Sequence, residues 1–144
     1  MKKALFVCIH NSARSQMAEA FCNQFSNGKV AAQSAGIEPG KLNPLAVKVM
    51  AEEGIDISNN KVKSVQRFID AGEKFDFVIT VCDETSAERC PVFPGSGQRL
   101  HFCFEDPSAL SGSEEVKMKK IRIIRDQIKN RIKEWLEKIS KENF

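Results

Sequence analysis

A cysteine and an arginine near the start of the chain flank a short loop, in the segment Cys8-Ile9-His10-Asn11-Ser12-Ala13-Arg14-Ser15. The loop follows an apolar run at residues 4–7, typical of a buried strand, and precedes a sequence with helical spacing. Backbone N–H groups, the positive end of the next helix and the guanidinium of Arg14 together suit a tetrahedral oxyanion. The same field should favour the thiolate of Cys8, a nucleophile directed at the central atom of the anion.

The sequence also predicts the conformation or contacts of three other residues of this loop. Asn11 stands where a tight loop requires a positive φ, which asparagine adopts more readily than most residues. Ser15 is expected to cap the helix and to hydrogen-bond the sulfur of Cys8, which eases the departure of that sulfur as a leaving group. The side chain of His10 should point away from the anion. The alternative interpretation is an ordinary strand-to-helix turn that contains a buried cysteine.

Two further cysteines, Cys82 and Cys90, follow the clearest strand pattern of the chain, at residues 75–81. Cys82 could attack the sulfur of Cys8, and Cys90 could then attack Cys82, which makes a relay of thiols. Two unrelated thiols are one alternative. Zinc is another, although the close Cys-Cys pairing of structural zinc sites is missing from the candidate ligands His101, Cys82, Cys90 and Cys103.

An acidic residue, Asp106, follows a strand pattern at residues 100–104 and precedes Pro107, which restricts it to extended geometry. Facing Cys8 across a pocket, its carboxyl group could donate a proton to the departing oxygen. Taken alone, an Asp-Pro pair is usually only a turn.

The two remaining cysteines are interpreted as small core residues. Cys22 lies on the apolar stripe of a helix, and Cys103 lies in a strand among aromatic residues.

The elements that must position these residues alternate between strands and helices. Strands are predicted at residues 3–7, 29–34, 75–81 and 100–104, and helices at residues 15–27, 44–53, 65–71 and from 114 to the end. This alternation predicts a parallel sheet covered on both sides, with ligands beyond the carboxyl ends of its strands. Cys8, Cys82 and Asp106 all follow strand ends, so one rim of the sheet can hold all three.

Length and composition exclude several other classes. The 144 residues are predicted to form one domain, residues 1–144, and a monomer is the default expectation. A net charge of +3 fits a small anion but is too low to indicate nucleic-acid binding. No stretch is long enough to span a membrane, and the apolar run after Lys3 is too short for a signal peptide. A cytoplasmic location is expected, where five cysteines suit catalysis or metal binding better than structural disulfides.

The segment from Cys8 to Ala20 resembles the opening of thioredoxin-coupled arsenate reductases, relatives of the low-molecular-weight protein tyrosine phosphatases. The resemblance covers nearly the whole chain. It implies a flavodoxin-like fold of the low-molecular-weight phosphatase type, with three layers and a four-stranded parallel sheet flanked by helices. The segments that carry the resemblance beyond Ala20 are Ser34-Ala35-Gly36-Ile37, Leu42-Asn43-Pro44, Gly54-Ile55-Asp56-Ile57-Ser58, Val78-Ile79-Thr80-Val81-Cys82, Cys90-Pro91, Glu105-Asp106-Pro107 and Arg122–Ile132.

The resemblance implies a reaction that uses three cysteines and no bound cofactor. Cys8 attacks arsenate, Asp106 assists the loss of water or hydroxide, and Cys82 then attacks Cys8. This second attack releases arsenite and leaves a Cys8–Cys82 disulfide. Cys90 takes over the bond, and thioredoxin reduces the exposed Cys82–Cys90 disulfide. The implied binding site for arsenate, or for phosphate or sulfate as analogues, is Cys8, Ile9, His10, Asn11, Ser12, Ala13, Arg14 and Ser15.

The chain departs from the family pattern at several places. Cys82 and Cys90 are separated by one residue more than is usual, which a loop should tolerate because closure entropy changes slowly with length. Ala13 stands where many relatives have another cysteine, and its presence should not stop the reaction. Thioredoxin is favoured as reductant, but glutaredoxin with glutathione or another small thiol remains an alternative.

A cation site found in some relatives is also altered. They bind potassium through positions that correspond here to Asn11, Glu19 and Ser34, together with an aspartate that Lys63 replaces. The Lys63 ammonium is expected to replace the ion by pairing with Glu19 and with the carbonyl oxygen of Asn11. No metal is therefore expected to be required.

Two other functions stay open at this stage. A phosphatase acting on phosphotyrosine or small phosphoesters would share the first step, through a Cys8–phosphate intermediate. Its relatives usually place aromatic residues after the Asp-Pro pair, whereas Ser108 and Ala109 follow here. The other is a noncatalytic regulator that binds oxyanions or metal, which an unreactive Cys8 would indicate.

Overall fold

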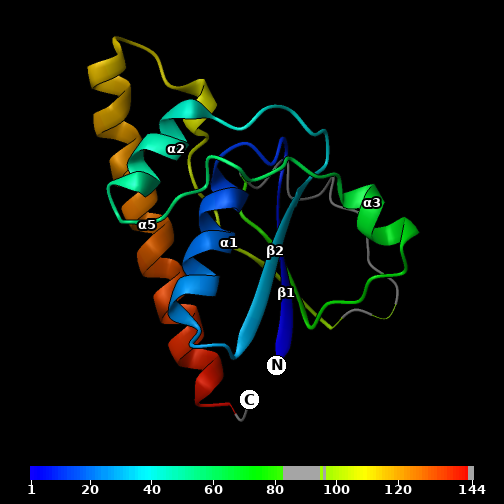
Figure 1. Cartoon of the computed structure of the whole chain (residues 1–144). Coiled ribbons are helices and arrows are strands. Elements are labelled where there is room, and N and C mark those ends of the chain that lie inside the picture. Colours follow the sequence, from blue (N-terminus) through cyan, green and yellow to red (C-terminus); the bar gives the residue numbers. More distant parts are fainter. Residues whose placement is uncertain (83–94, 96, 143–144) are drawn as a thin grey trace.

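Four parallel strands form one sheet in a computed structural model that describes residues 1–82, 95 and 97–142 (Figure 1). The strand order is β2-β1-β3-β4, and the prediction of a four-stranded parallel sheet flanked by helices is confirmed. The strands are β1 (Lys2–Cys8), β2 (Val30–Gly36), β3 (Phe77–Thr80) and β4 (Gln98–His101). The helices are α1 (Arg14–Phe25), α2 (Pro44–Ala51), α3 (Val65–Asp70), the 3-10 turn η1 (Pro107–Ala109) and α5 (Glu114–Ser140).

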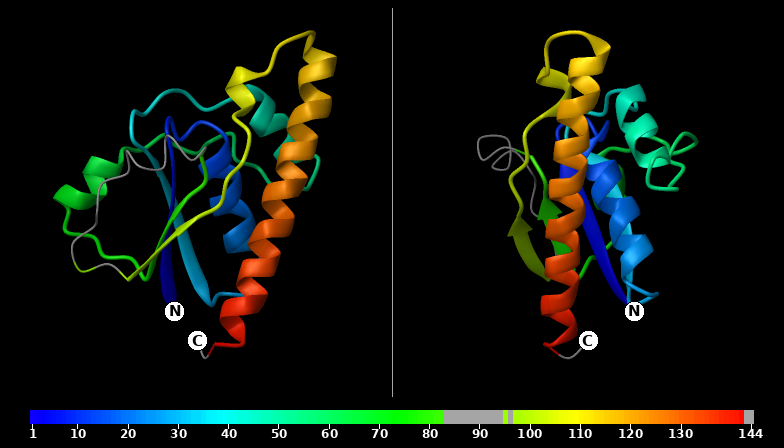
Figure 2. Two further views of the ribbon diagram at one scale, coloured as in Figure 1. Left: turned by 180° about the vertical axis from the view of Figure 1, so that it is seen from behind. Right: turned by 90° about the vertical axis from the view of Figure 1, so that its left-hand side faces the viewer.

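The helices make two layers around this sheet. Figures 1 and 2 show α1, α2 and α5 on one side and α3 on the other, with the Cys8 loop at the end opposite both termini. The alternation of β1 explains this arrangement, since Phe6 and Cys8 pack into the larger apolar cluster while Leu5 and Val7 pack into the smaller one beneath α3. Both faces of the central strand are therefore buried, as expected for a parallel sheet.

The long helix α5 covers the larger cluster with an apolar stripe at helical spacing. Trp135 meets three aromatic rings edge-on across the sheet, with centroids 5.1 to 6.3 Å away. These contacts hold α5 along the sheet, as the predicted stripe requires. The buried residues of the stripe are Ile121, Ile124, Ile128, Ile132, Trp135 and Ile139.

Helices α2 and α3 begin after the capping residues that the sequence predicts, whereas α1 does not. Asn43 accepts a hydrogen bond from the Leu45 N–H, and Ser64 caps α3. The prediction that Ser15 caps α1 is wrong, because the helix already begins at Arg14 and Ser15 lies inside its first turn. The hydroxyl of Ser15 is therefore available to the active-site loop.

The fourth strand lies two to three residues earlier than predicted. It ends at His101, and the chain beyond it runs outside the sheet ladder. Phe102 and Phe104 turn into the larger cluster, so Cys103 between them points away and is exposed. The prediction that Cys103 is a core residue is wrong, whereas the burial predicted for Cys22 is confirmed.

Among the described residues, no helix is long and apolar enough to cross a membrane.

Candidate active site

The loop after β1 turns its backbone carbonyls outward. The carbonyl oxygens of five consecutive residues each accept a hydrogen bond from outside the loop or from α1. With these carbonyls turned away, the loop presents its N–H groups to the concave side around Cys8, as an oxyanion site requires. The five pairs are Cys8 O with Ile37 N (3.1 Å), Ile9 O with Glu38 N (2.7 Å), His10 O with Gly40 N (3.0 Å), Asn11 O with Gln16 Nε2 (3.2 Å) and Ser12 O with Asn43 N (2.9 Å).

Close approach of β2 makes this arrangement possible. A Cβ at Gly36 would lie 2.8 Å from Asn11 N and 2.9 Å from Ile9 O. Only glycine lets the strand end and the loop pack this tightly. The side chain of His10 hydrogen-bonds the Glu38 carbonyl at 2.8 Å on this outer side, which confirms that it points away from the concave face.

Two donors meet the sulfur of Cys8, a side chain only 2% exposed. The Asn11 N–H donates to Sγ at 3.2 Å, and Ser15 Oγ lies 2.9 Å from Sγ. Ser15 Oγ already accepts a hydrogen bond from Asn11 Nδ2 at 2.7 Å, so its own hydrogen can point to the sulfur. The sulfur thus has two hydrogen-bond donors within reach. Asn11 has a φ of 54°, as predicted.

Sequence reasoning missed the residue behind Asn11. Gln16 is fully buried, and its Nε2 lies 3.0 Å from Asn11 Oδ1 and 3.1 Å from the Lys61 carbonyl. Asn60 completes the set by donating to Gln16 Oε1 at 3.0 Å. The only local signal is a polar residue next to the apolar positions of α1, which does not reveal these partners.

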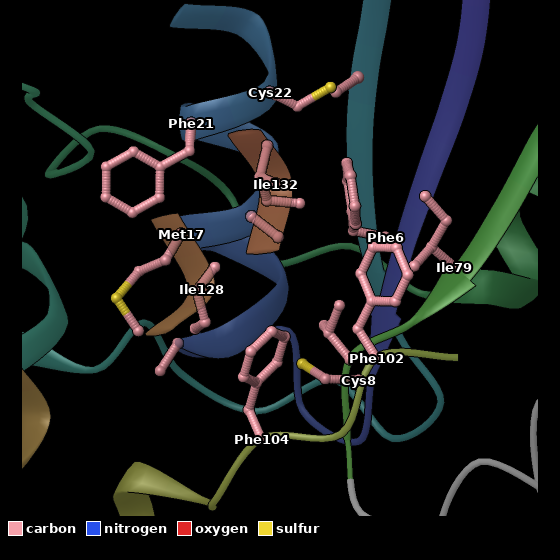
Figure 3. Packing of buried hydrophobic residues seen from close by; sticks show 14 of the residues in the cluster. Phe6, Cys8, Met17, Phe21, Cys22, Ile79, Phe102, Phe104, Ile128 and Ile132 are labelled. Atoms are coloured by element: carbon pink, nitrogen blue, oxygen red, sulfur yellow. The ribbon is translucent and has the colours of Figure 1, made fainter. Parts of the chain in front are cut away.

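Arg14 joins the loop to the segment beyond β4. Its side chain is 5% exposed, with one guanidinium nitrogen donating to the Phe104 carbonyl at 3.1 Å and another 3.8 Å from Asp106 Oδ2. Figure 3 shows Phe102 and Phe104 beside Cys8 at the edge of the larger cluster. The guanidinium thus lies between the loop and the carboxyl group that the sequence predicted on the same rim.

Asp106 is held mainly by its own turn. Its Oδ1 accepts from the N–H and the hydroxyl of Ser108 at 2.9 and 2.7 Å. Ser12, Pro107 and Ser108 line one cleft of about 370 Å³, whose other walls come from residues 41–45, Leu110 and Lys117. Ser12 of the Cys8 loop and the turn after Asp106 thus border the same cleft.

Cys82 lies two residues beyond the end of β3, the strand next to β1. In the sheet register Val7 pairs with Thr80, and Val81 N donates to the Val7 carbonyl at 2.8 Å. Cys82 follows directly and is fully buried. Cys8 is one residue and Cys82 two residues past the Val7–Thr80 pair, so the two cysteines lie at the same end of neighbouring strands. Cys90 lies outside the described residues. The last step of the predicted thiol relay and the zinc alternative both involve Cys90.

In the described part of the chain, no three side chains of His, Cys, Asp or Glu are placed to share an ion.

A half-buried ion pair supports the rear of the loop. Lys63 Nζ lies 3.8 Å from Glu19 Oε1, which also accepts a hydrogen bond from the Ser34 hydroxyl at 3.1 Å. Burial raises the pKa of Glu19, while the Lys63 charge and the Ser34 hydrogen bonds oppose that rise. The prediction that the Lys63 ammonium pairs with the Asn11 carbonyl oxygen is wrong. Lys63 contacts Asn11 through its backbone N–H instead, which donates to Asn11 Oδ1 at 3.0 Å. The ammonium instead reaches the Lys61 carbonyl at 3.4 Å.

Cys22, on α1, is another buried thiol. Burial, with a smaller contribution from the Glu19 charge, raises the pKa of Cys22 to about 12. Cys22 therefore stays a protonated core residue at neutral pH.

The comparisons with known proteins agree with this geometry. The family described as Low molecular weight phosphotyrosine protein phosphatase matches residues 3–144. An arsenate reductase of Bacillus subtilis (strain 168) is 42% identical over 132 residues, covering 92% of this chain and 93% of the relative. One from Halalkalibacterium halodurans is 39% identical over 136 residues, covering 94% and 96%.

Solved structures give the same result. The structure of an arsenate reductase in the phosphate binding state has a TM-score of 0.75 and 34% identity, covering 96% of this chain and 99% of that chain. A thioredoxin-dependent arsenate reductase of Corynebacterium glutamicum has a TM-score of 0.72 and 26% identity, covering 99% of this chain and 63% of that chain.

Proposed function

The chain belongs to the low-molecular-weight phosphotyrosine protein phosphatase family and, within it, to the arsenate reductases, and we propose that it reduces arsenate to arsenite through a relay of Cys8, Cys82 and Cys90 that thioredoxin resets. The observation that carries the proposal is the Cys8 loop, with its carbonyls bonded outward and two donors on the sulfur. The thioredoxin-dependent relative from Corynebacterium glutamicum supports the choice of reductant.

The first step joins arsenate to Cys8. The loop N–H groups and the Arg14 guanidinium bind the anion oxygens, and the thiolate attacks arsenic as one oxygen departs. Asp106, whose Oδ2 lies 3.8 Å from the Arg14 guanidinium, donates the proton with which that oxygen leaves as water. Arsenic remains in its +5 state in this step, bound to the sulfur of Cys8.

The second step is the reduction. Cys82 attacks the sulfur of Cys8, a disulfide forms, and the electron pair of the S–As bond passes to arsenic, which leaves as arsenite. The proton of Cys82 ends on an arsenite oxygen. The neighbouring strand ends of β1 and β3 support this step, because they bring the two cysteines to one place on the rim.

The third step moves the disulfide. Cys90 attacks Cys82, Cys8 leaves as the thiolate, and the resulting Cys82–Cys90 disulfide is the substrate of thioredoxin. Fully buried sulfur at Cys8 and Cys82 is out of reach of a protein reductant, which is the physical reason for a third cysteine. No bound cofactor or metal takes part in this scheme.

A phosphatase reaction is the second candidate, and the matching family description favours considering it. It would stop at the Cys8 intermediate, which water would hydrolyse. Two further cysteines would then have no role, and the turn after Asp106 carries Ser108 and Ala109 rather than aromatic side chains that would grip a tyrosyl ring.

The test supplies arsenate, thioredoxin, thioredoxin reductase and NADPH. The wild type should consume NADPH continuously, whereas Cys90→Ser should make about one arsenite per protein and stop. Cys103→Ser is the matched control, an exposed thiol near the same rim, and should cycle like the wild type. Sustained thioredoxin-dependent turnover by Cys90→Ser would exclude the relay.

A further inference from the structure

We propose that Gln16 and Asn60 are positioning residues that make Cys8 reactive at neutral pH. The inference concerns the nucleophile of the proposed function and rests on it. Neither side chain touches the concave face of the loop. Both act through Asn11, whose backbone and side chain bring two donors to the sulfur of Cys8.

Gln16 holds Asn11 from behind through the nitrogen of its side-chain amide. Its Nε2 lies within hydrogen-bond distance of the Asn11 carbonyl (3.2 Å) and of Asn11 Oδ1 (3.0 Å). One side chain thereby fixes both the peptide and the side-chain amide of a residue in the left-handed region, at φ 54°. A non-glycine residue keeps that conformation when its surroundings determine it.

Asn60 fixes Gln16 in turn. Its Nδ2 donates to Gln16 Oε1 at 3.0 Å, which sets the orientation of the Gln16 amide. The same segment contributes the Lys61 carbonyl to Gln16 Nε2 and the Lys63 N–H to Asn11 Oδ1. A segment about 45 residues away in the sequence is thus tied to the catalytic loop through one fully buried glutamine.

The sulfur of Cys8 is where this network ends. With Asn11 held, its N–H lies 3.2 Å from Sγ, and its Nδ2 lies 2.7 Å from the Ser15 oxygen, which is 2.9 Å from Sγ. Loss of Gln16 removes the hydrogen bonds to both the carbonyl and Oδ1 of Asn11. The N–H and Nδ2 of Asn11 then shift together, although the Lys63 N–H still holds Oδ1. The thiolate of Cys8 then loses stabilisation relative to the thiol.

The experiment measures the rate of Cys8 alkylation by iodoacetamide against pH. Trypsin releases Ala4–Arg14, which contains Cys8 and no other cysteine, so mass spectrometry follows this thiol alone. The variants are Gln16→Met, which keeps the side-chain volume, and the milder Asn60→Ala. The control is Asn23→Leu, because Asn23 lies on the same helix and its amide makes two hydrogen bonds to the backbone of Ala32, away from Cys8.

In Gln16→Met the alkylation rate at pH 7 should fall about fivefold, and in Asn60→Ala about twofold, as expected for the loss of a typical hydrogen bond. The profile should move to higher pH and reach the wild-type plateau, since only the protonation of Cys8 changes. Asn23→Leu should follow the wild type.

Superimposable profiles for wild type, Gln16→Met and Asn60→Ala would overturn the inference, as would an equal shift in Asn23→Leu or a rate lowered equally at every pH. If Gln16→Met does not fold, Asn60→Ala decides alone. Because alkylation needs no arsenate, a shifted profile in a protein that fails to reduce arsenate would reject the proposed function and keep this inference.

Discussion

The two sides of the active-site cleft are built differently. On one side, the carbonyls of Cys8 to Ser12 are bonded to other segments or to α1, and Arg14 has a side chain 5% exposed. On the other side, Asp106 is 37% exposed and its carboxylate is bonded to Ser108 of its own turn. The loop proposed to bind the anion is therefore held by tertiary contacts, whereas the proposed acid is held mainly by hydrogen bonds within its own turn.

The largest expected effect is the loss of the nucleophile. Cys8→Ser should abolish arsenite production, because a serine oxygen can neither form a disulfide with Cys82 nor act as a thiolate. Arsenite is measured directly in the coupled assay with thioredoxin. The fold should persist, since the exchange is nearly isosteric and both donors remain, so phosphate should still protect the variant against thermal unfolding. Undiminished arsenite production would reject the mechanism at its first step.

The second largest effect is expected from substitution of Asp106, the proposed acid. Asp106→Asn should lower kcat about 100-fold with KM for arsenate nearly unchanged, because the carboxyl group acts on the departing oxygen rather than on binding. Ser108→Ala, which removes one of the two hydrogen bonds to Oδ1, serves as the comparison and should cost only about twofold. A rise in KM alone for Asp106→Asn would show that the residue binds the anion instead.

A substitution that disturbs the Cys8 loop should instead change KM for arsenate more than kcat. In Gly36→Ala the added Cβ would lie 2.8 Å from Asn11 N, so the loop must shift. We expect KM for arsenate to rise about tenfold and stability to fall by about 1–3 kcal/mol. Gly40→Ala is the control, because the three atoms nearest its Cβ all belong to the His10 side chain, the first at 3.2 Å, rather than to the loop backbone. Unchanged arsenate binding in Gly36→Ala would mean that the loop is not as rigid as its contacts indicate.

The smallest effect concerns the cation site behind the same loop. With Lys63 beside Glu19, turnover and thermal stability should be the same in potassium and in sodium chloride at equal ionic strength. Calorimetry and the coupled assay measure both. A strong increase with potassium alone would contradict the replacement of the ion by the lysine, and Lys63→Asp would then be the variant in which to look for an ion.

Much of this arrangement could be predicted from short stretches of sequence. The apolar run before Cys8, the Asn43-Pro44 start of α2, the positive φ of Asn11 and the isoleucine spacing of α5 each depend on residues within one or two turns of each other. Local sterics, capping and periodicity decide such features before any tertiary contact exists.

The rest depended on contacts between distant segments. Ser15 met the sulfur as predicted but did not cap α1. Cys103 lay outside rather than inside, and Gln16 acquired partners about 45 residues away. No local pattern carries that information, because a polar side chain on a helix finds its acceptors only when other segments pack against it. The sequence alone thus determined which residues can do chemistry and on which elements they lie. The tertiary structure decided which groups surround the sulfur, since burial and hydrogen bonding are properties of the packed molecule.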